Sequence, residues 1–233
     1  MSTSTITKSV NDGVLNLWRE EFGDRLDKVK CPLLYPDLPT GGILFIGCNP
    51  ALPKRNHYSV PCLESVWDNE YQVAELIKRQ HEVHKSYPYF RPCNEIAASL
   101  GMEWAHVDWF FQRVTSQTEL EDEVLGEPAT WDEPVELSNF ARKQIQLSRK
   151  LMDACQPQIV VVANAFASKI AKWEFNLGTL DQHGLMWANI SGKGVPLFLS
   201  GMLTGQRALD RGSRDRLEWH LRHAMKLIGQ GNN

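Results

Sequence analysis

The stretch that most constrains the fold is the run from Ile43 to Ala51, in which four apolar residues precede Gly-Cys-Asn-Pro-Ala. A short apolar run that ends in turn residues is typical of a strand buried on both faces, as at the centre of a parallel sheet. In open α/β sheets, ligands bind at the carboxyl ends of such strands. Here that end carries Gly47, which permits close backbone approach, and Asn49, an amide donor and acceptor held by Pro50. Asn49 is therefore the first candidate for contact with a substrate.

Three further apolar runs complete the pattern of an α/β protein. We expect strands at residues 105–112, 159–162 and 195–199, the last of them reached through a hairpin whose first arm covers 185–190. Helical periodicity occupies residues 10–29, 63–85, 93–100, 138–155, 166–173 and 214–228. This alternation predicts a three-layer α/β/α sandwich around a central, mostly parallel, four-stranded sheet.

The sequence indicates one domain over residues 1–233, because no linker divides it and α/β folds of this length commonly form one core. Residues 1–8 are mostly small and polar, and we expect them to form a disordered tail. Residues 114–137 carry eight carboxylates and no lysine or arginine, which predicts an acidic surface loop. If the protein meets DNA, this loop is expected to face away from it.

Composition excludes several classes of protein. There is no run of eighteen apolar residues and no signal peptide at Met1, so we expect a cytoplasmic protein without a membrane partner. The five cysteines are scattered and form no Cys-x-x-Cys, which disfavours a disulfide framework and a zinc or iron-sulfur site. His81 and His84 are three residues apart but have no third ligand evident nearby, so we expect no metal and no cofactor. Nothing in the sequence indicates an oligomeric state.

The formal net charge of −3 gives no global attraction to nucleic acid, so such binding requires a local patch. The C-terminal segment supplies one, in which six cations outnumber three acids, Asp210, Asp215 and Glu218. Arginines at the start of a helix, beside its N–H groups, favour a phosphate site. The alternative is a solvated amphipathic helix whose acids pair with the arginines. The cations are Arg207, Arg211, Arg214, Arg216, Arg222 and Lys226.

Two loops carry aromatic or cationic side chains that suit a planar or anionic ligand. Lys54, Arg55, His57 and Tyr58 follow the first strand, and Phe90 belongs to an aromatic loop further along the chain. Tyr58 or Phe90 could stack on a planar ring. The alternative, for each residue alone, is an ordinary surface loop with a packed aromatic side chain.

The order of these motifs resembles the uracil-DNA glycosylase superfamily. Gly47-Cys48-Asn49-Pro50 is similar to the Gly-x-Asn-Pro motif of its mismatch-specific and single-strand-selective branches. Residues 152–170 resemble the family's passage of helix, proline, apolar strand and short helix. The family's second motif, often His-Pro-Ser, corresponds to residues 202–207, where Met-Leu-Thr-Gly-Gln-Arg looks most like the mismatch-specific branch. The resemblance covers residues 43–228.

The resemblance implies a DNA repair enzyme that flips a base out of the stack and hydrolyses its N-glycosidic bond, the base being uracil or a related damaged or mismatched one. Asn49 would then hold the attacking water. Backbone N–H groups of Gly47 and Cys48 would meet a carbonyl of the base, while Tyr58 or Phe90 stacks on it and Gln112 reads its edge. Asp108, Phe110 and Gln112 stand near the place of the family's base-reading asparagine. The residues expected to contact DNA are Thr204, Gly205, Arg207, Arg211 and Arg214.

Two alternatives remain open. The first is a catalytically inactive protein on the same fold, which binds DNA or another protein through the arginine patch or the acidic loop. The second is a small-molecule hydrolase that acts on free nucleosides and needs no patch. The departure of residues 202–207 from the family's His-Pro-Ser motif favours the inactive protein.

Overall fold

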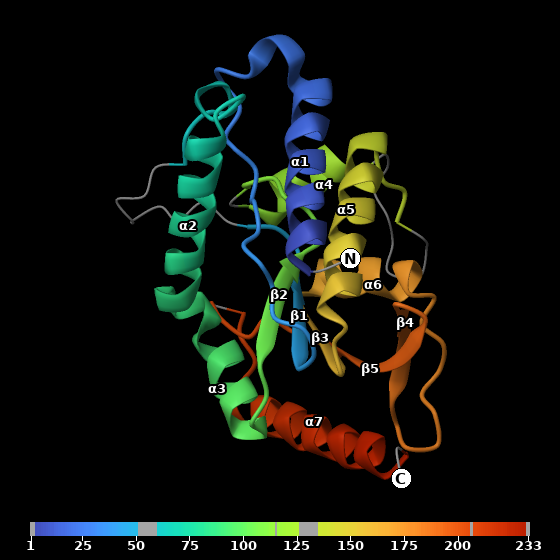
Figure 1. The fold of residues 1–233 in the computed structure, drawn as a ribbon. Helices are drawn as coiled ribbons and strands as arrows, with labels where there is room; N and C mark the ends of the chain where they lie inside the picture. The colour runs from blue at the N-terminus through green and yellow to red at the C-terminus, as the bar shows by residue number, and fades with distance from the viewer. Residues whose placement is uncertain (1–2, 51–59, 115, 126–134, 206, 232–233) are drawn as a thin grey trace. The chain divides into compact units, whose positions relative to one another are not determined.

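The computed structural model of the chain describes residues 3–50, 60–114, 116–125, 135–205 and 207–231. This described part holds seven α-helices and one five-stranded sheet of order β2-β1-β3-β5-β4 (Figure 1). The predicted α/β class is confirmed. The strands are β1 (Ile43–Gly47), β2 (Trp104–Asp108), β3 (Ile159–Ala163), β4 (Met186–Ile190) and β5 (Lys193–Ser200). The helices are α1 (Thr3–Phe22), α2 (Glu70–Ser86), α3 (Arg91–Leu100), α4 (Gln117–Val124), α5 (Asn139–Cys155), α6 (Ala165–Glu174) and α7 (Arg211–Gly231).

The sheet is mostly parallel. β3 lies between β1 and β5 and is parallel to both, while β4 runs antiparallel to β5. β1 and β3 are buried along their whole length, as their unbroken apolar sequences require. The predicted count of four strands is wrong, because the first arm of the predicted hairpin, Met186–Ile190, pairs fully along β5 and forms the fifth strand.

The chain divides into two compact units. Unit 1 consists of Met1–Leu38, Cys48–Ser86 and Asp108–Leu151, and unit 2 of Pro39–Gly47, Tyr87–Val107 and Met152–Asn233. Each unit is assembled from three separated segments, so the chain passes repeatedly from one to the other. The single domain expected from the sequence stays a prediction.

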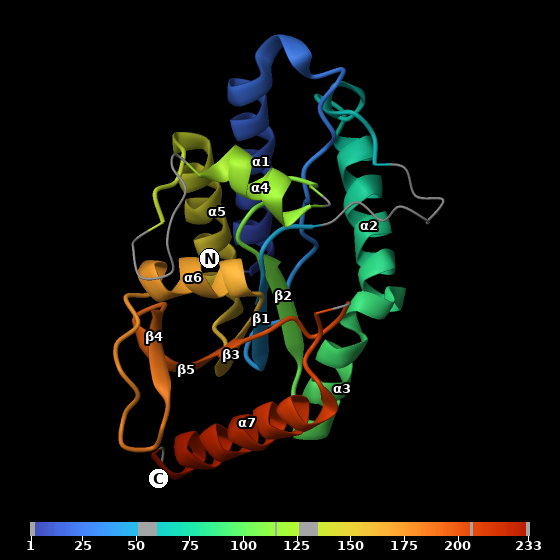
Figure 2. The ribbon, with the colours of Figure 1, turned by 180° about the vertical axis from the view of Figure 1, so that it is seen from behind.

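In unit 2, helices α3 and α7 share a hydrophobic cluster with one face of the sheet, and the two helices lie side by side in both views (Figures 1 and 2). Ile43 and Phe45 of β1 enter this cluster together with Leu217 and Leu221 of α7. The chain enters β1 through Gly42, which has φ +71°, and a Cβ atom at this position would overlap the carbonyl oxygen of Glu103. Glycine is therefore required where the chain enters the central strand.

In unit 1, helices α1 and α5 pack against each other through aromatic side chains. The ring of Phe140 lies edge-on to Trp18, at 4.9 Å between centroids, and to Phe22, at 5.5 Å. Gly13 supports this packing, because a Cβ atom there would come within 2.9 Å of a methyl group of Leu147. Among the described helices, none combines the length and the apolar character that a bilayer crossing requires.

The expectation of a disordered tail at residues 1–8 is wrong for residues 3–8, because α1 begins at Thr3. The side chain of Thr7 is only 2% exposed, so tertiary packing stabilises a segment whose serines and threonines are weak helix formers. The predicted helix at 63–85 is also divided. Leu63–Ser65 forms a short 3-10 helix, and α2 begins after Asn69, whose side chain accepts a hydrogen bond from the backbone N–H of Gln72.

The acidic segment 114–137 is not a plain surface loop, because it contains α4. Ser116 caps this helix by accepting a hydrogen bond from the backbone N–H of Glu119. Leu120 and Val124 are fully buried, so apolar residues spaced four apart pack the acidic segment into unit 1, to which it belongs. Residues 115 and 126–134 of the segment lie outside the described part.

Candidate functional site

The candidate site is the strand end at Cys48 and Asn49, together with residues 108–114, which follow β2. Both segments belong to unit 1. The backbone N–H of Phe110 donates to the carbonyl oxygen of Cys48 at 3.0 Å. The side-chain nitrogen of Asn49 donates to the carbonyl oxygen of Val114 at 2.7 Å and, at 3.5 Å, to that of Gln112. These bonds join residues 110–114 to Cys48 and Asn49, and β2 ends at Asp108 rather than at the predicted Gln112.

Asn49 is half-buried, and its hydrogen bonds define how its amide is turned. Both bonds to the 112–114 backbone use the side-chain nitrogen Nδ2. Within the described residues, no donor reaches the amide oxygen Oδ1. Because Nδ2 is fixed, the direction of Oδ1 is fixed as well, and Oδ1 is the atom that a water molecule or a ligand N–H can use.

Asp108 places a carboxyl group at the end of β2. Its side chain is buried, and this burial raises its pKa from 3.8 to about 7, with the cationic Arg113 acting in the opposite direction. The backbone N–H of Asp108 donates to the hydroxyl oxygen of Tyr35 at 2.8 Å, which positions the end of β2. A carboxyl group that titrates near neutral pH is suited to accept or release a proton.

Sequence reasoning named Asp108 only as a neighbour of the base-reading position. In the sequence, Asp108 lies inside the apolar run that was predicted as a strand at 105–112. The burial of this carboxyl could not be predicted from sequence, because the end of β2 is positioned by residues such as Tyr35, which lies 73 positions away.

Cys48 is a buried neutral thiol rather than a nucleophile. Burial raises its pKa well above the ordinary value, and the negative charges of Asp108 and Glu121 raise the pKa further. Gly47, the residue before Cys48, is the buried last residue of β1. Contact of the backbone N–H groups of Gly47 and Cys48 with a base stays a prediction.

Gln112 lies in a buried chain of amides rather than at an open edge. Its Nε2 donates to the carboxylate of Glu123 at 2.8 Å, and its Oε1 accepts from Nε2 of Gln144 at 2.6 Å. Gln144 in turn accepts from the backbone N–H of Phe111 at 2.8 Å. Both ends of Gln112 are therefore occupied, and the chain links the exit of β2 to α4 and α5. Gln112 reads a base edge only if these bonds break, so this role stays a prediction.

The structure tests neither of the two predicted stacking residues at Asn49. Tyr58 lies outside the described residues, as do Lys54, Arg55 and His57. Phe90 belongs to unit 2, whereas Asn49 belongs to unit 1. The ring of Phe90 packs within its own unit, 5.1 Å from His106 and 6.0 Å from Trp104, so its contacts there are those of a packing residue.

The predicted DNA contacts all belong to unit 2. Gly205 is exposed and has φ +87°, and the backbone N–H of Ala208 returns to its carbonyl oxygen at 3.2 Å. Thr204 in this turn is half-buried, whereas Arg207 and Arg211 are exposed. Contact of these residues with DNA stays a prediction.

Arg214 is engaged in ion pairs, with Glu95 at 2.8 Å and with Glu218 at 3.4 Å. The start of α7 is also occupied, because the carboxylate of Asp210 accepts hydrogen bonds from the N–H and the hydroxyl of Ser213. These bonds hold the pKa of Asp210 below its ordinary value. Asp210 therefore caps the first turn of this helix, and the phosphate site expected there stays a prediction.

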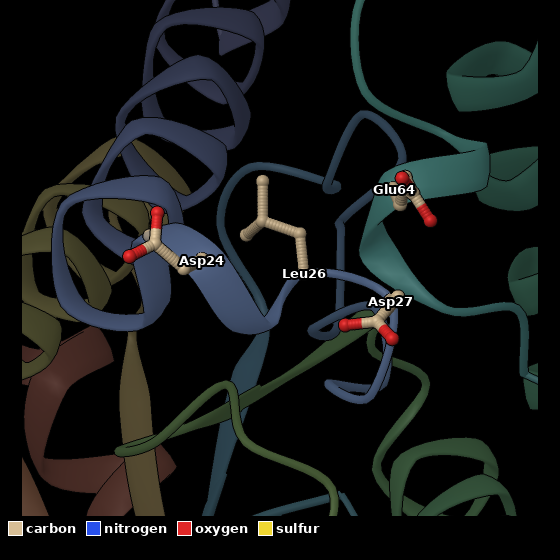
Figure 3. Close-up of a pocket in the computed structure, with 5 residues that line it drawn as sticks. Asp24, Leu26, Asp27 and Glu64 are labelled. Carbon is tan, nitrogen blue, oxygen red and sulfur yellow. The ribbon is translucent and has the colours of Figure 1, made fainter.

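A shallow hollow on unit 1 is lined by Gly23, Asp24, Leu26, Asp27 and Glu64 (Figure 3). Its three carboxylates do not converge on one point, and the side chain of Leu26 lies between Asp24 and Glu64 (Figure 3). Within the described part of the chain, no three side chains of His, Cys, Asp or Glu come together as metal ligands. None of the predicted site residues lines this hollow.

No model of a known protein family matches this sequence, and no curated protein matches it. The family resemblance therefore depends on the motifs quoted above, and the activity that it implies is a proposal.

Proposed function

We propose that this chain is a DNA glycosylase-like protein that hydrolyses the N-glycosidic bond of uracil or of a related damaged or mismatched base. The observation that carries the proposal is the fixed amide of Asn49 at the carboxyl end of the central strand. The side-chain nitrogen donates to the backbone carbonyls of Gln112 and Val114, and these bonds fix the direction in which the amide oxygen points.

Hydrolysis of a glycosidic bond requires a water molecule placed below C1′, an acceptor for its proton and stabilisation of charge on the leaving base. Asn49 Oδ1 accepts a hydrogen bond from the water and orients it. An amide is not a strong base, but orientation serves a dissociative pathway in which the base leaves before the water attacks. Asp108, whose pKa is about 7, is the group at this strand end that suits the role of proton acceptor.

A second candidate is a catalytically inactive protein on the same fold that binds DNA or another protein. The observation that favours it is the occupied state of Gln112, whose two polar ends both bond within the protein. A pocket that recognises a base needs polar groups able to reach it. Exposed arginines such as Arg207 and Arg211 would still support binding.

The two candidates are separated by incubating the protein with labelled oligonucleotides that carry uracil, a mismatched base or another deaminated base. We expect base release, detected as strand cleavage after alkali, and its loss in Asn49→Ala. Asn94→Ala is the matched control. It also removes an asparagine side chain that makes a hydrogen bond, which Asn94 of α3 accepts from the indole N–H of Trp104 in β2. Salt-sensitive binding with every substrate left intact would instead establish the inactive protein. Turnover of free deoxyuridine alone would point to a nucleoside hydrolase.

A further inference from the structure

The outer face of α7, which we define as Arg211, Arg216, Trp219, Arg222 and Lys226, has no part in the core. The inner face of the helix carries Leu217, Leu221 and Ala224, all buried. At 100° per residue, Trp219 is placed almost opposite these three side chains. Its side chain is 60% exposed, so a large aromatic group stands in the middle of a solvent-facing surface.

Cations surround this tryptophan. Arg211, Arg216, Arg222 and Lys226 are all exposed, and one carboxylate, that of Asp215, shares the face with them. Within the described part of the chain, no ion pair engages Arg211, Arg222 or Lys226, in contrast to Arg214 on the side of the helix. The outer face is therefore a positive surface on a protein whose formal net charge is −3.

The indole ring of Trp219 is held in place by two histidines of the same helix. It stacks on His223 with ring centroids 5.5 Å apart and planes 6° apart, and it meets His220 edge-on at 5.0 Å. A ring that is already ordered loses little conformational freedom when a ligand stacks on it.

We propose that the outer face of α7 binds a single strand of nucleic acid, with one base stacked on Trp219 and neighbouring phosphates bound by the arginines. Positive grooves that present aromatic rings are the common means of holding single strands, and each stacked base contributes about 1–3 kcal/mol. Arginine also suits phosphate because its planar guanidinium donates two parallel hydrogen bonds. This inference rests on the proposed function for its choice of DNA as the strand.

An anionic membrane would attract the same cations, but the helix lacks the required apolar face. A helix that lies on a bilayer buries an apolar face in it. The apolar face of α7 is buried against β1, β3 and α3 within unit 2. Among the described residues of α7, Trp219 is the one large hydrophobic side chain that is exposed. A single tryptophan among arginines fits a stacked base better than it fits a lipid layer.

The test measures binding of a fluorescent single-stranded thymidine oligonucleotide of about 12 nucleotides to the full chain, by anisotropy, over a series of salt concentrations. We expect Trp219→Ala to weaken binding about tenfold, and Trp173→Ala, a partly exposed tryptophan of α6, to leave it unchanged. Replacing Arg216 and Arg222 together with alanine should weaken binding and lower the salt slope by about 1.4.

An abasic strand of the same length separates stacking from charge. The unsubstituted protein should bind the abasic strand about tenfold more weakly, whereas Trp219→Ala should bind both strands alike. The inference is overturned if Trp219→Ala binds the thymidine strand as the unsubstituted protein does. It is equally overturned if anionic phosphatidylserine vesicles bind while the oligonucleotide does not.

These outcomes are distinct from failure of the proposed function. Strand binding that depends on Trp219, without base release from any substrate, would retain the inference and reject the glycosylase. If Trp219→Ala does not change the rate of base release when both protein and DNA are too dilute for saturated binding, the glycosylase is retained and the inference is rejected.

Discussion

The strand end around Asn49 and the outer face of α7 treat polar groups in opposite ways. At the strand end, Asp108, Gln112 and Gln144 are at most 6% exposed, and the two glutamines bond to each other. On the outer face of α7, the arginines are exposed, and few of their N–H groups bond within the protein. The polar groups of the first region bond to one another within the protein, whereas those of the second region face solvent.

This difference predicts where a substitution is costly. Removing one member of a buried polar chain leaves its partners without a bond and away from water, which destabilises the fold. Replacing an exposed cation breaks no buried contact and has little effect on the free energy of unfolding. Substitutions at the strand end should therefore change stability and chemistry together, and those on the outer face of α7 should change binding alone.

The largest expected effect is the pH dependence given by Asp108. Burial raises its pKa to about 7 from 3.8, so the folded state binds the proton more tightly than the unfolded state. The stability that this proton provides is complete below the lower pKa and is lost as the pH rises through the higher one. Between those values, the unfolding free energy of the unsubstituted protein should fall relative to that of Asp108→Asn by on the order of 4 kcal/mol. Urea unfolding at several pH values measures this, and a constant difference would contradict the assignment.

A smaller effect follows from breaking the amide chain. Gln112→Ala leaves the buried Nε2 of Gln144 without its acceptor, and we expect the unfolding free energy to fall by about 1–3 kcal/mol. The matched surface change Arg216→Ala should alter the unfolding free energy by less than about 0.5 kcal/mol. Equal effects of the two substitutions in urea unfolding would remove the contrast between the regions.

The smallest effect concerns Arg214, which belongs to α7 but points to its side. Its ion pairs with Glu95 and Glu218 are partly exposed, so salt screens them. Arg214→Ala should lower the melting temperature slightly at low salt and hardly at all in about 1 M salt. Arg222→Ala, which breaks no ion pair among the described residues, should leave the melting temperature unchanged at both. A salt-independent loss would show that Arg214 acts through packing of its side chain.

The sheet could be predicted because its signals are local. The runs at β1 and β3 are apolar throughout, and the hairpin of β4 and β5 has a turn between two strand-like segments. The end of β2 could not be predicted, because Trp109, Phe110 and Phe111 continue the apolar run past Asp108. That end is set by bonds to Cys48 and Gln144, which are distant in the sequence.

The place of Asn49 just after the end of β1 was predictable, whereas its hydrogen bonds were not. The position of Asn49 directly after an apolar strand indicated a polar group at the sheet edge. Its anchor at Val114 lies 65 positions further along the chain, and no periodicity indicates such a contact. The start of α1 was missed for the same reason, because burial of Thr7 depends on residues outside its own segment.

The most direct test of the account is the rate of base release from a uracil-containing single strand at saturating protein concentration, compared between Asn49→Ala and Trp219→Ala. The account predicts that Asn49→Ala lowers the rate constant by at least about 100-fold and still binds the strand. It predicts that Trp219→Ala retains the rate constant but needs about tenfold more protein to reach it. Release by Asn49→Ala at the unsubstituted rate, or no release by the unsubstituted protein from any base tested, would contradict it.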